Sequence, residues 1–148
     1  MKQLEMIVKL RETTGAGVLD CRRALESCDG SYDRAVEALR ASGAERLERR
    51  SGRETAEGRI AVYNHGGRIG AVLELRCETD FVARNESFIA LAEILVRQVA
   101  AMNPESVEEL LTQSHIRDGA MSISELISAE AQRFGENVRV ERFCRYEL

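Results

Sequence analysis

Residues 59–77 restrict the fold most strongly, because they predict a β-hairpin. Apolar and polar residues alternate over 59–65 and again over 69–77, which is the period of a strand with one buried face. Gly66 and Gly67 separate the two runs, and adjacent glycines are typical of a tight hairpin turn. The outward positions near the end of the second run are Glu74, Arg76 and Glu78. Helices are therefore expected on only one face of the sheet.

Helical patterns follow the hairpin, and a last strand closes the region. Apolar residues recur at helical spacing over 88–102, 104–111 and 122–134. Ser122 and Glu125 match a capping box, and Pro104 is suited to open a helix. Val138, Val140 and Phe143 predict a strand whose alternation slips after Val140, as at a bulge. We expect an α+β class, with residues 59–148 as a β-β-α-α-β unit whose three-stranded antiparallel sheet is covered by helices on one face.

The first 43 residues predict a bundle of three short helices. Gly15 and Gly17 should end the first helix, because glycine permits a sharp turn. Ser31 is placed to cap the third helix, which Ser42 and Gly43 should stop. The residues that share one face of the first helix are Leu4, Ile7 and Val8. Residues 44–58 lose this periodicity and alternate in charge, so they are interpreted as a linker between domains 1–43 and 59–148.

The composition favours a folded domain and disfavours two kinds of partner. Hydrophobic residues make up 44% and charged residues 31%, which suits a globular chain of 148 residues. A net charge of −4 argues against direct nucleic-acid binding. No run reaches the ~18 apolar residues of a membrane helix, and the N-terminus lacks the apolar stretch of a signal peptide. A cytoplasmic location is expected.

The cysteines and histidines predict no metal or catalytic centre. Cys21, Cys28, Cys77 and Cys144 include no Cys-x-x-Cys pair, and the two histidines stand far from them in the sequence. The cysteines are interpreted as small buried hydrophobic residues in a reducing compartment. No arrangement of serine or cysteine with histidine suggests a nucleophile. We therefore expect no enzymatic activity and no cofactor.

The run Thr79-Asp80-Phe81-Val82-Ala83-Arg84 lies at a predicted strand-to-helix junction. Thr79 or Asp80 is suited to cap the helix that follows. An aromatic residue at such a junction either returns to the core or projects as an anchor for a partner. The residue pattern leaves both alternatives open for Phe81.

Two motifs resemble the signatures of the elongation factor Ts family. The first is TDFVAR over 79–84, followed by NESF, and the second is LRETTGAGVLDCRRAL over 10–25, which is similar to LRxxTGAGxxDCxxAL. The closing segment over 135–148 also resembles the family, so the similarity runs the length of the chain. The resemblance implies an exchange factor for the GTPase elongation factor Tu, with an N-terminal bundle that resembles the ubiquitin-associated fold.

The resemblance also implies which residues contact the GTPase. The Asp and Phe of the family's TDFV loop act near the bound magnesium and phosphates, and they correspond to Asp80 and Phe81, flanked by Thr79 and Val82. The docking edge of the bundle corresponds to Thr14, Gly15, Ala16, Gly17, Val18 and Leu19. Many members have methionine at the last two positions, so Val18 and Leu19 keep the apolar character with less plasticity.

The chain departs from many family members in having one copy of the α/β unit. A single sheet with an uncovered face favours pairing with a second copy, so a homodimer is expected. One rival hypothesis is an adaptor or chaperone that binds the GTPase without promoting exchange. A second rival is an enzyme, which no residue pattern supports.

Overall fold

The computed structural model describes residues 2–148, so Met1 of the predicted first domain lies outside the described residues. The chain forms two compact units. The described part of the first contains residues 2–52 and 128–135, and the second contains 53–127 and 136–148. The predicted domain limits, with a linker over 44–58, stay a prediction.

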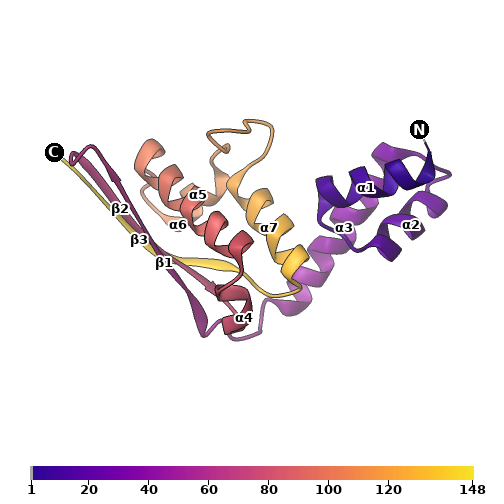
Figure 1. Ribbon diagram of the computed structural model, residues 1–148, viewed down its shortest axis with the longest axis horizontal. Coiled ribbons are helices and arrows are strands. Elements are labelled where there is room, and N and C mark those ends of the chain that lie inside the picture. Colours follow the sequence, from indigo (N-terminus) through magenta and orange to yellow (C-terminus); the bar gives the residue numbers. More distant parts are fainter. Residues whose placement is uncertain (1) are drawn as a thin grey trace. The chain divides into compact units, whose positions relative to one another are not determined.

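The first unit is helical (Figure 1). It contains α1 (Gln3–Thr14), α2 (Val18–Ser27) and α3 (Tyr32–Arg50), together with the second half of α7 (Ile123–Phe134). The N–H of Gly15 donates to the Arg11 carbonyl at 2.8 Å and closes α1, as predicted. The buried cluster consists of Ile7, Leu10, Ala16, Cys21, Ala24, Leu25, Cys28, Ala35 and Leu39.

Two predictions for this unit were wrong. The inner face of α1 carries Ile7, Leu10 and Thr14, whereas Leu4 and Val8 are exposed, because Leu10 and Thr14 continue the stripe from Ile7 by steps of three and four residues. The third helix does not stop at Gly43 but continues to Arg50. A Cβ atom at Gly43 would lie 2.5 Å from Gln132 Oε1, so this glycine permits close approach within the unit rather than ending the helix.

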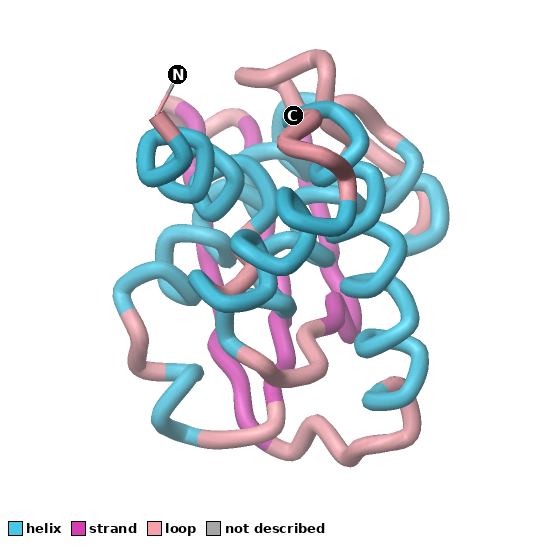
Figure 2. Tube along the Cα trace, turned by 90° about the vertical axis from the view of Figure 1, so that its right-hand side faces the viewer, coloured by secondary structure: helices cyan, strands magenta, loops and turns pink. Residues whose placement is uncertain are grey.

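The second unit contains a three-stranded antiparallel sheet in the order β1-β2-β3. Figure 2 draws its strands in magenta. The strands are β1 (Glu57–His65), β2 (Ile69–Cys77) and β3 (Arg139–Glu147). Gly66 and Gly67 have φ values of 60° and 71°, which confirms the predicted tight turn. The register of β2 with β3 shifts between Glu74 and Leu75, opposite Glu141, which confirms the predicted bulge.

The helices of this unit differ in number from the predicted β-β-α-α-β order. Between β2 and β3 the described chain has α4 (Asp80–Ala83), α5 (Glu86–Met102), α6 (Val107–Thr112) and α7. The Ser122–Glu125 capping box is confirmed, with Glu125 N–H donating to Ser122 Oγ at 3.1 Å and Ser122 N–H to Glu125 Oε2 at 2.9 Å. Pro104 does not open α6, because Ser106 caps that helix through the Glu109 N–H.

One face of the sheet is buried and the other is open, as the alternation predicts. The helix α5 lies along the covered face (Figure 1), where its Phe88, Leu91 and Leu95 are buried. The strand residues on that face are also buried: Ala61, Ala71, Leu73, Leu75, Cys77 and Val140. The fold is therefore α+β. Within residues 2–148, no helix is long and apolar enough to cross a membrane.

Candidate functional site

The predicted TDFV loop is a short helical turn that follows β2. Thr79 occupies the N-cap position of α4, and its Oγ1 accepts a hydrogen bond from the Val82 N–H at 3.4 Å. The Ala83 N–H donates to the Thr79 carbonyl, and Ala83 itself is buried. A turn of four residues is too short to be stable as an isolated helix. Its shape therefore depends on what holds its ends.

Phe81 projects from this turn, with 84% of its surface exposed. The alternative that placed Phe81 in the core is therefore wrong. Val82 is partly buried, and Asp80 pairs with Arg84 across one helical turn, with 3.6 Å between Oδ2 and Nη2. Both members of this ion pair are largely exposed, so the pair adds little to stability and leaves the Asp80 carboxylate accessible. The turn thus displays an aromatic ring and a carboxylate side by side.

A group of hydrogen bonds ties the start of this turn to the segment before β3. Glu136 accepts from the N–H groups of Glu78 and Thr79 at 3.1 and 3.0 Å, and from Thr79 Oγ1 at 2.6 Å. Glu78 Oε2 in return accepts from the Asn137 N–H at 2.6 Å. We call these two reciprocal links the Glu78–Glu136 clasp.

Cys77 adds a further contact beneath the turn. Its Sγ donates to the Thr79 carbonyl at 3.2 Å, and the residue is fully buried. Burial, and next the charge of Glu136, raise the pKa of the Cys77 thiol to about 11. Cys77 is thus an unreactive structural residue, as predicted from its place at the end of a strand.

The predicted docking edge of the bundle divides into buried and exposed residues. Thr14 and Ala16 are buried, and Thr14 Oγ1 donates to the Leu10 carbonyl at 2.7 Å while accepting from the Ala16 N–H. Gly17 is the N-cap of α2. Val18 and Leu19 are the exposed apolar residues, at 50% and 66%. Thr14 and Ala16 therefore support the loop from within, whereas Val18 and Leu19 are exposed in the first turn of α2.

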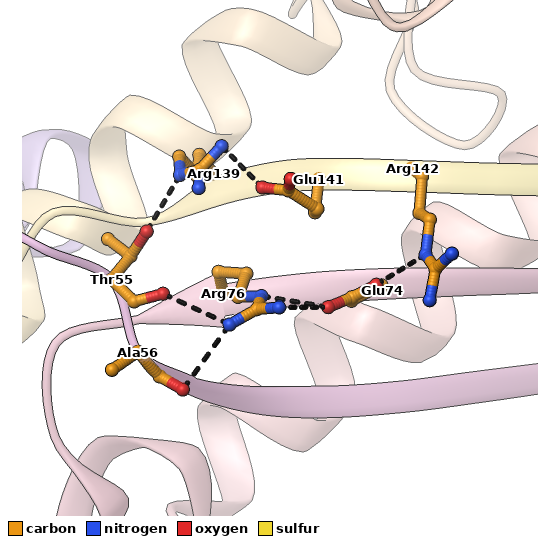
Figure 3. Close-up of polar contacts among 7 residues, drawn as sticks. All are labelled: Thr55, Ala56, Glu74, Arg76, Arg139, Glu141 and Arg142. Atoms are coloured by element: carbon orange, nitrogen blue, oxygen red, sulfur yellow. Dashed lines mark hydrogen bonds and ion pairs between the residues drawn. The ribbon is translucent and has the colours of Figure 1, made fainter.

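The open face of the sheet has an apolar half and a charged half. In the apolar half Val62 pairs with Val72, which pairs with Cys144, and Ile60 and Tyr146 extend the patch. Cys144 is exposed here, unlike the other three cysteines, so its predicted burial was wrong. In the charged half Glu74 accepts from Arg76 and Arg142, at 2.8 and 2.7 Å (Figure 3). The hydrogen bond from Arg142, more than any other contact, lowers the pKa of the Glu74 carboxyl.

Histidine, cysteine and acidic side chains form no group of three or more suited to a metal ion within residues 2–148. The exposed apolar side chains of Phe81 on the turn and of Val18 and Leu19 at the start of α2 are instead suited to bind a macromolecular surface.

Comparison with known proteins identifies the family. The family model described as "Elongation factor TS" matches residues 78–148, which include the turn, the clasp and β3. A protein named Elongation factor Ts from Thermotoga neapolitana is 40% identical over 189 aligned residues, covering 98% of this chain and 96% of that protein. The chain belongs to the elongation factor Ts family. The alignment is longer than the 148 residues of this chain, so that family member has residues with no counterpart here.

Other family members differ in how much of them the chain covers. The protein of the same name from Leptospira biflexa is 35% identical over 190 residues, covering 97% of this chain and 96% of that protein. The one from Aquifex aeolicus is 41% identical over 150 residues, but these make up only 52% of that protein. The family thus includes proteins that this chain matches over nearly their whole length and proteins that it matches over about half of their length.

Sequence reasoning found the displayed residues of the turn but not the residue that holds them. Glu136 follows the glycine that ends α7, and nothing in its local pattern relates it to Thr79. The two residues are 57 positions apart. The predicted antiparallel sheet was only an indirect signal, because it did not specify that β2 and β3 are neighbours, the pairing that brings the end of β2 beside the start of β3.

Proposed function

We propose that this chain is a guanine-nucleotide exchange factor for elongation factor Tu in translation elongation. The observation that carries the proposal is the exposure of Phe81, at 84%, beside Asp80 on a tethered turn in the segment that the family model matches. Large aromatic side chains are mostly buried, and an exposed ring on a fixed turn is suited to anchor a partner. This role makes and breaks no covalent bond and needs no cofactor or metal held by the chain itself.

The proposed mechanism is a linkage between two binding equilibria. A factor that binds the nucleotide-free GTPase more tightly than the GDP-bound form must weaken GDP binding by the same factor. Phe81 would pack against the GTPase domain and displace a loop or helix there. Asp80 would accept hydrogen bonds from the displaced backbone. The displacement would disturb the magnesium, which requires near-ideal octahedral geometry.

The bundle is proposed to dock on the GTPase through Val18 and Leu19, with Gly15 and Gly17 allowing the loop to approach closely. Thr14 and Ala16 support the loop from within. We propose that this bundle is ubiquitin-associated-like and that it makes up the first domain, over 1–43. The partner is a protein in the cytoplasm, and the proposal includes no direct contact with nucleic acid or a membrane.

The open sheet face is proposed to pair with a second copy of the chain. The charged half is largely satisfied within the chain, since Glu74 bonds to both Arg76 and Arg142. The apolar half has no such partners, and Val62 and Tyr146 are 69% and 77% exposed. An apolar patch beside a self-paired charged cluster suits two-fold association, because each copy then covers the same patch on the other.

Sedimentation equilibrium tests the dimer. The chain is expected to sediment as a dimer at micromolar concentration, and Val62→Glu is expected to shift it to monomers by placing a charge in the patch. Arg59→Glu is the control, because Arg59 lies on the same strand with its side chain in the alternate direction. Labelling of Cys144 by a thiol reagent should slow as concentration rises. A monomer at every concentration would remove this part of the proposal.

Stopped-flow release of a fluorescent GDP analogue from elongation factor Tu tests the main proposal. Release is measured without and with the chain, over a range of magnesium concentrations. The expected result is acceleration that excess magnesium reduces, because the metal opposes the displaced state. Binding without acceleration would contradict the proposal and support the non-exchanging adaptor or chaperone.

A further inference from the structure

The residues around the displayed turn point to a role for Glu136 that the exposed surface alone does not reveal. Both oxygens of its carboxylate are used: Oε1 accepts from the N–H groups of Glu78 and Thr79, and Oε2 accepts from the Thr79 hydroxyl. Hydrogen bonds to a charged acceptor are shorter and stronger than neutral ones, and the hydroxyl contact at 2.6 Å is of this kind. One side chain thus captures three donors at the start of α4.

Every polar group of Thr79 therefore has a hydrogen-bond partner. Its N–H and hydroxyl donate to Glu136, its hydroxyl oxygen also accepts from the Val82 N–H, and its carbonyl accepts from Cys77 Sγ. Since the Thr79 hydroxyl proton is directed at Glu136, a lone pair of Oγ1 remains for the cap. Thr79 Oγ1 can therefore donate to Glu136 and accept from the Val82 N–H at the same time.

The second link of the clasp restricts Glu136 itself. Asn137 follows Glu136 directly, and its N–H donates to Glu78 Oε2 at 2.6 Å. Glu78 also pairs with Arg53, with 3.6 Å between Oε1 and Nη1, and its side chain is only 14% exposed. The segment that carries Glu136 is therefore itself held in place by the hydrogen bond from Asn137 to Glu78.

We propose that Glu136 is a positioning residue for Phe81 and Asp80, which rests on the proposed exchange function. Phe81 is two residues beyond Thr79 and stands in solvent, so the clasp provides the fixed base from which its ring is presented. An aromatic ring on a loose turn would rearrange on contact and transmit less of its binding energy to the partner. Glu136 is therefore expected to support the rate of GDP release more than the strength of docking, which the bundle also provides.

The variant Glu136→Gln tests this role in the full chain. Glutamine has nearly the same shape but replaces one acceptor oxygen by an NH₂ group, which cannot accept from the turn. At a saturating concentration of the chain, the stimulated rate of GDP release is expected to fall by about tenfold or more. A small displacement of Phe81 should lower the rate in the way that a small misplacement of a catalytic group does. The concentration that gives half of the maximal effect should change by less than about threefold, because the docking residues are intact.

The matched control is Glu125→Gln. Glu125 is also a capping carboxylate, and it accepts from the Ser122 N–H at 2.9 Å, but it caps α7 and has no contact with the turn. Because glutamine can still accept this single hydrogen bond, the substitution should change thermal stability little and leave GDP release unchanged. Thr79→Val is the second variant, since it removes the hydroxyl and leaves Glu136 its two backbone donors. It should give a loss of release smaller than that of Glu136→Gln.

A structural readout accompanies the kinetics. In Glu136→Gln, hydrogen exchange at the Thr79 and Val82 amides should become faster, while exchange within α5 stays unchanged. Equal loss of release in Glu125→Gln, or full release at saturation in Glu136→Gln, would overturn the positioning role. The unsubstituted chain is measured first, so that a failure of the exchange function itself is recognised as a chain that binds but never accelerates release.

Discussion

The two regions proposed to contact the GTPase are built differently. The Asp80–Ala83 turn is held by the carboxylate of Glu136, which lies in a distant segment, and it projects one aromatic ring. The loop before α2 is held by Thr14, whose Oγ1 donates to the Leu10 carbonyl and accepts from the Ala16 N–H, and the first turn of α2 displays two aliphatic residues, Val18 and Leu19. No side-chain cap closes the start of α2, whose N-cap is Gly17.

This difference suggests a division of work between the two regions. The ring of Phe81 can displace part of a partner, because hydrogen bonds fix the backbone that carries it. A smooth aliphatic edge provides area for docking without imposing one geometry. The turn should therefore control how fast GDP leaves, and the loop should control how tightly the chain binds.

The largest effect is expected for Phe81→Ala. Truncation of an exposed aromatic anchor costs ~2–4 kcal/mol at an interface, which corresponds to a loss of GDP release between about 30-fold and 1,000-fold. Folding should change by less than ~0.5 kcal/mol, because the ring touches solvent. Stopped-flow GDP release and chemical denaturation measure the two effects.

Phe88→Ala is the control for the same substitution at a buried ring. Phe88 is fully buried in α5, seven residues away in the sequence. Removing it should cost ~3–5 kcal/mol of stability. If Phe81→Ala lost as much stability as Phe88→Ala, its kinetic defect would reflect unfolding and not the loss of an anchor.

The next largest effect is expected for Gly15→Ala, in the loop between α1 and α2. Gly15 has a φ of 71°, and a Cβ atom there would lie 2.6 Å from Arg133 Cγ and 3.0 Å from the Ala129 carbonyl. Gly15→Ala should therefore cost on the order of 2–3 kcal/mol, from the left-handed conformation and from the displacement of Arg133 together. Urea denaturation measures the loss.

Gly30→Ala separates these two causes. Gly30 has a φ of 76° with nothing within 4 Å of the added atom, so only the conformational cost of ~1–2 kcal/mol applies. Equal losses in the two variants would show that Arg133 moves aside freely, and the loop would then be less rigid than its contacts indicate.

A smaller effect is expected for Leu19→Ala. Removing an exposed aliphatic side chain from a docking surface should weaken the affinity for the GTPase by ~1–2 kcal/mol, or roughly 5-fold to 30-fold. The rate of GDP release at saturation should stay unchanged, because the turn is intact. Titration of the GTPase at several factor concentrations separates the two quantities. A lower plateau rate would contradict the division of work between loop and turn.

The sequence predicted those features that depend on neighbouring residues. The turn at Gly66 and Gly67 and the Ser122–Glu125 capping box involve residues at most three positions apart, and both were confirmed. The bulge opposite Glu74 was visible as a break in alternation. In each case the physical cause, a turn conformation or a cap, lies within a few residues of the signal.

Features that depend on distant residues were not predictable in the same way. Gly43 has the local signature of a helix end, yet it lies within α3, where it accommodates Gln132. The turn α4 is too short to show a period, and its tether, Glu136, is distant in sequence. The candidate site was therefore predicted through the displayed residues and their family resemblance, whereas its support required the tertiary structure.

The smallest effect is expected for Arg84→Ala, and it tests whether the turn has any support on its exposed side. Arg84 pairs with Asp80 at 3.6 Å, and 82% of its side chain is exposed. Such pairs contribute ~0.3–0.5 kcal/mol, so the stability of the chain should hardly change. GDP release should also stay within about twofold, because the clasp on the inner side still holds Thr79. Stopped-flow release with and without 0.5 M salt checks this, since salt screens the same pair. A loss comparable to that of Glu136→Gln would mean that the exposed ion pair, and not the clasp, fixes the direction of Phe81.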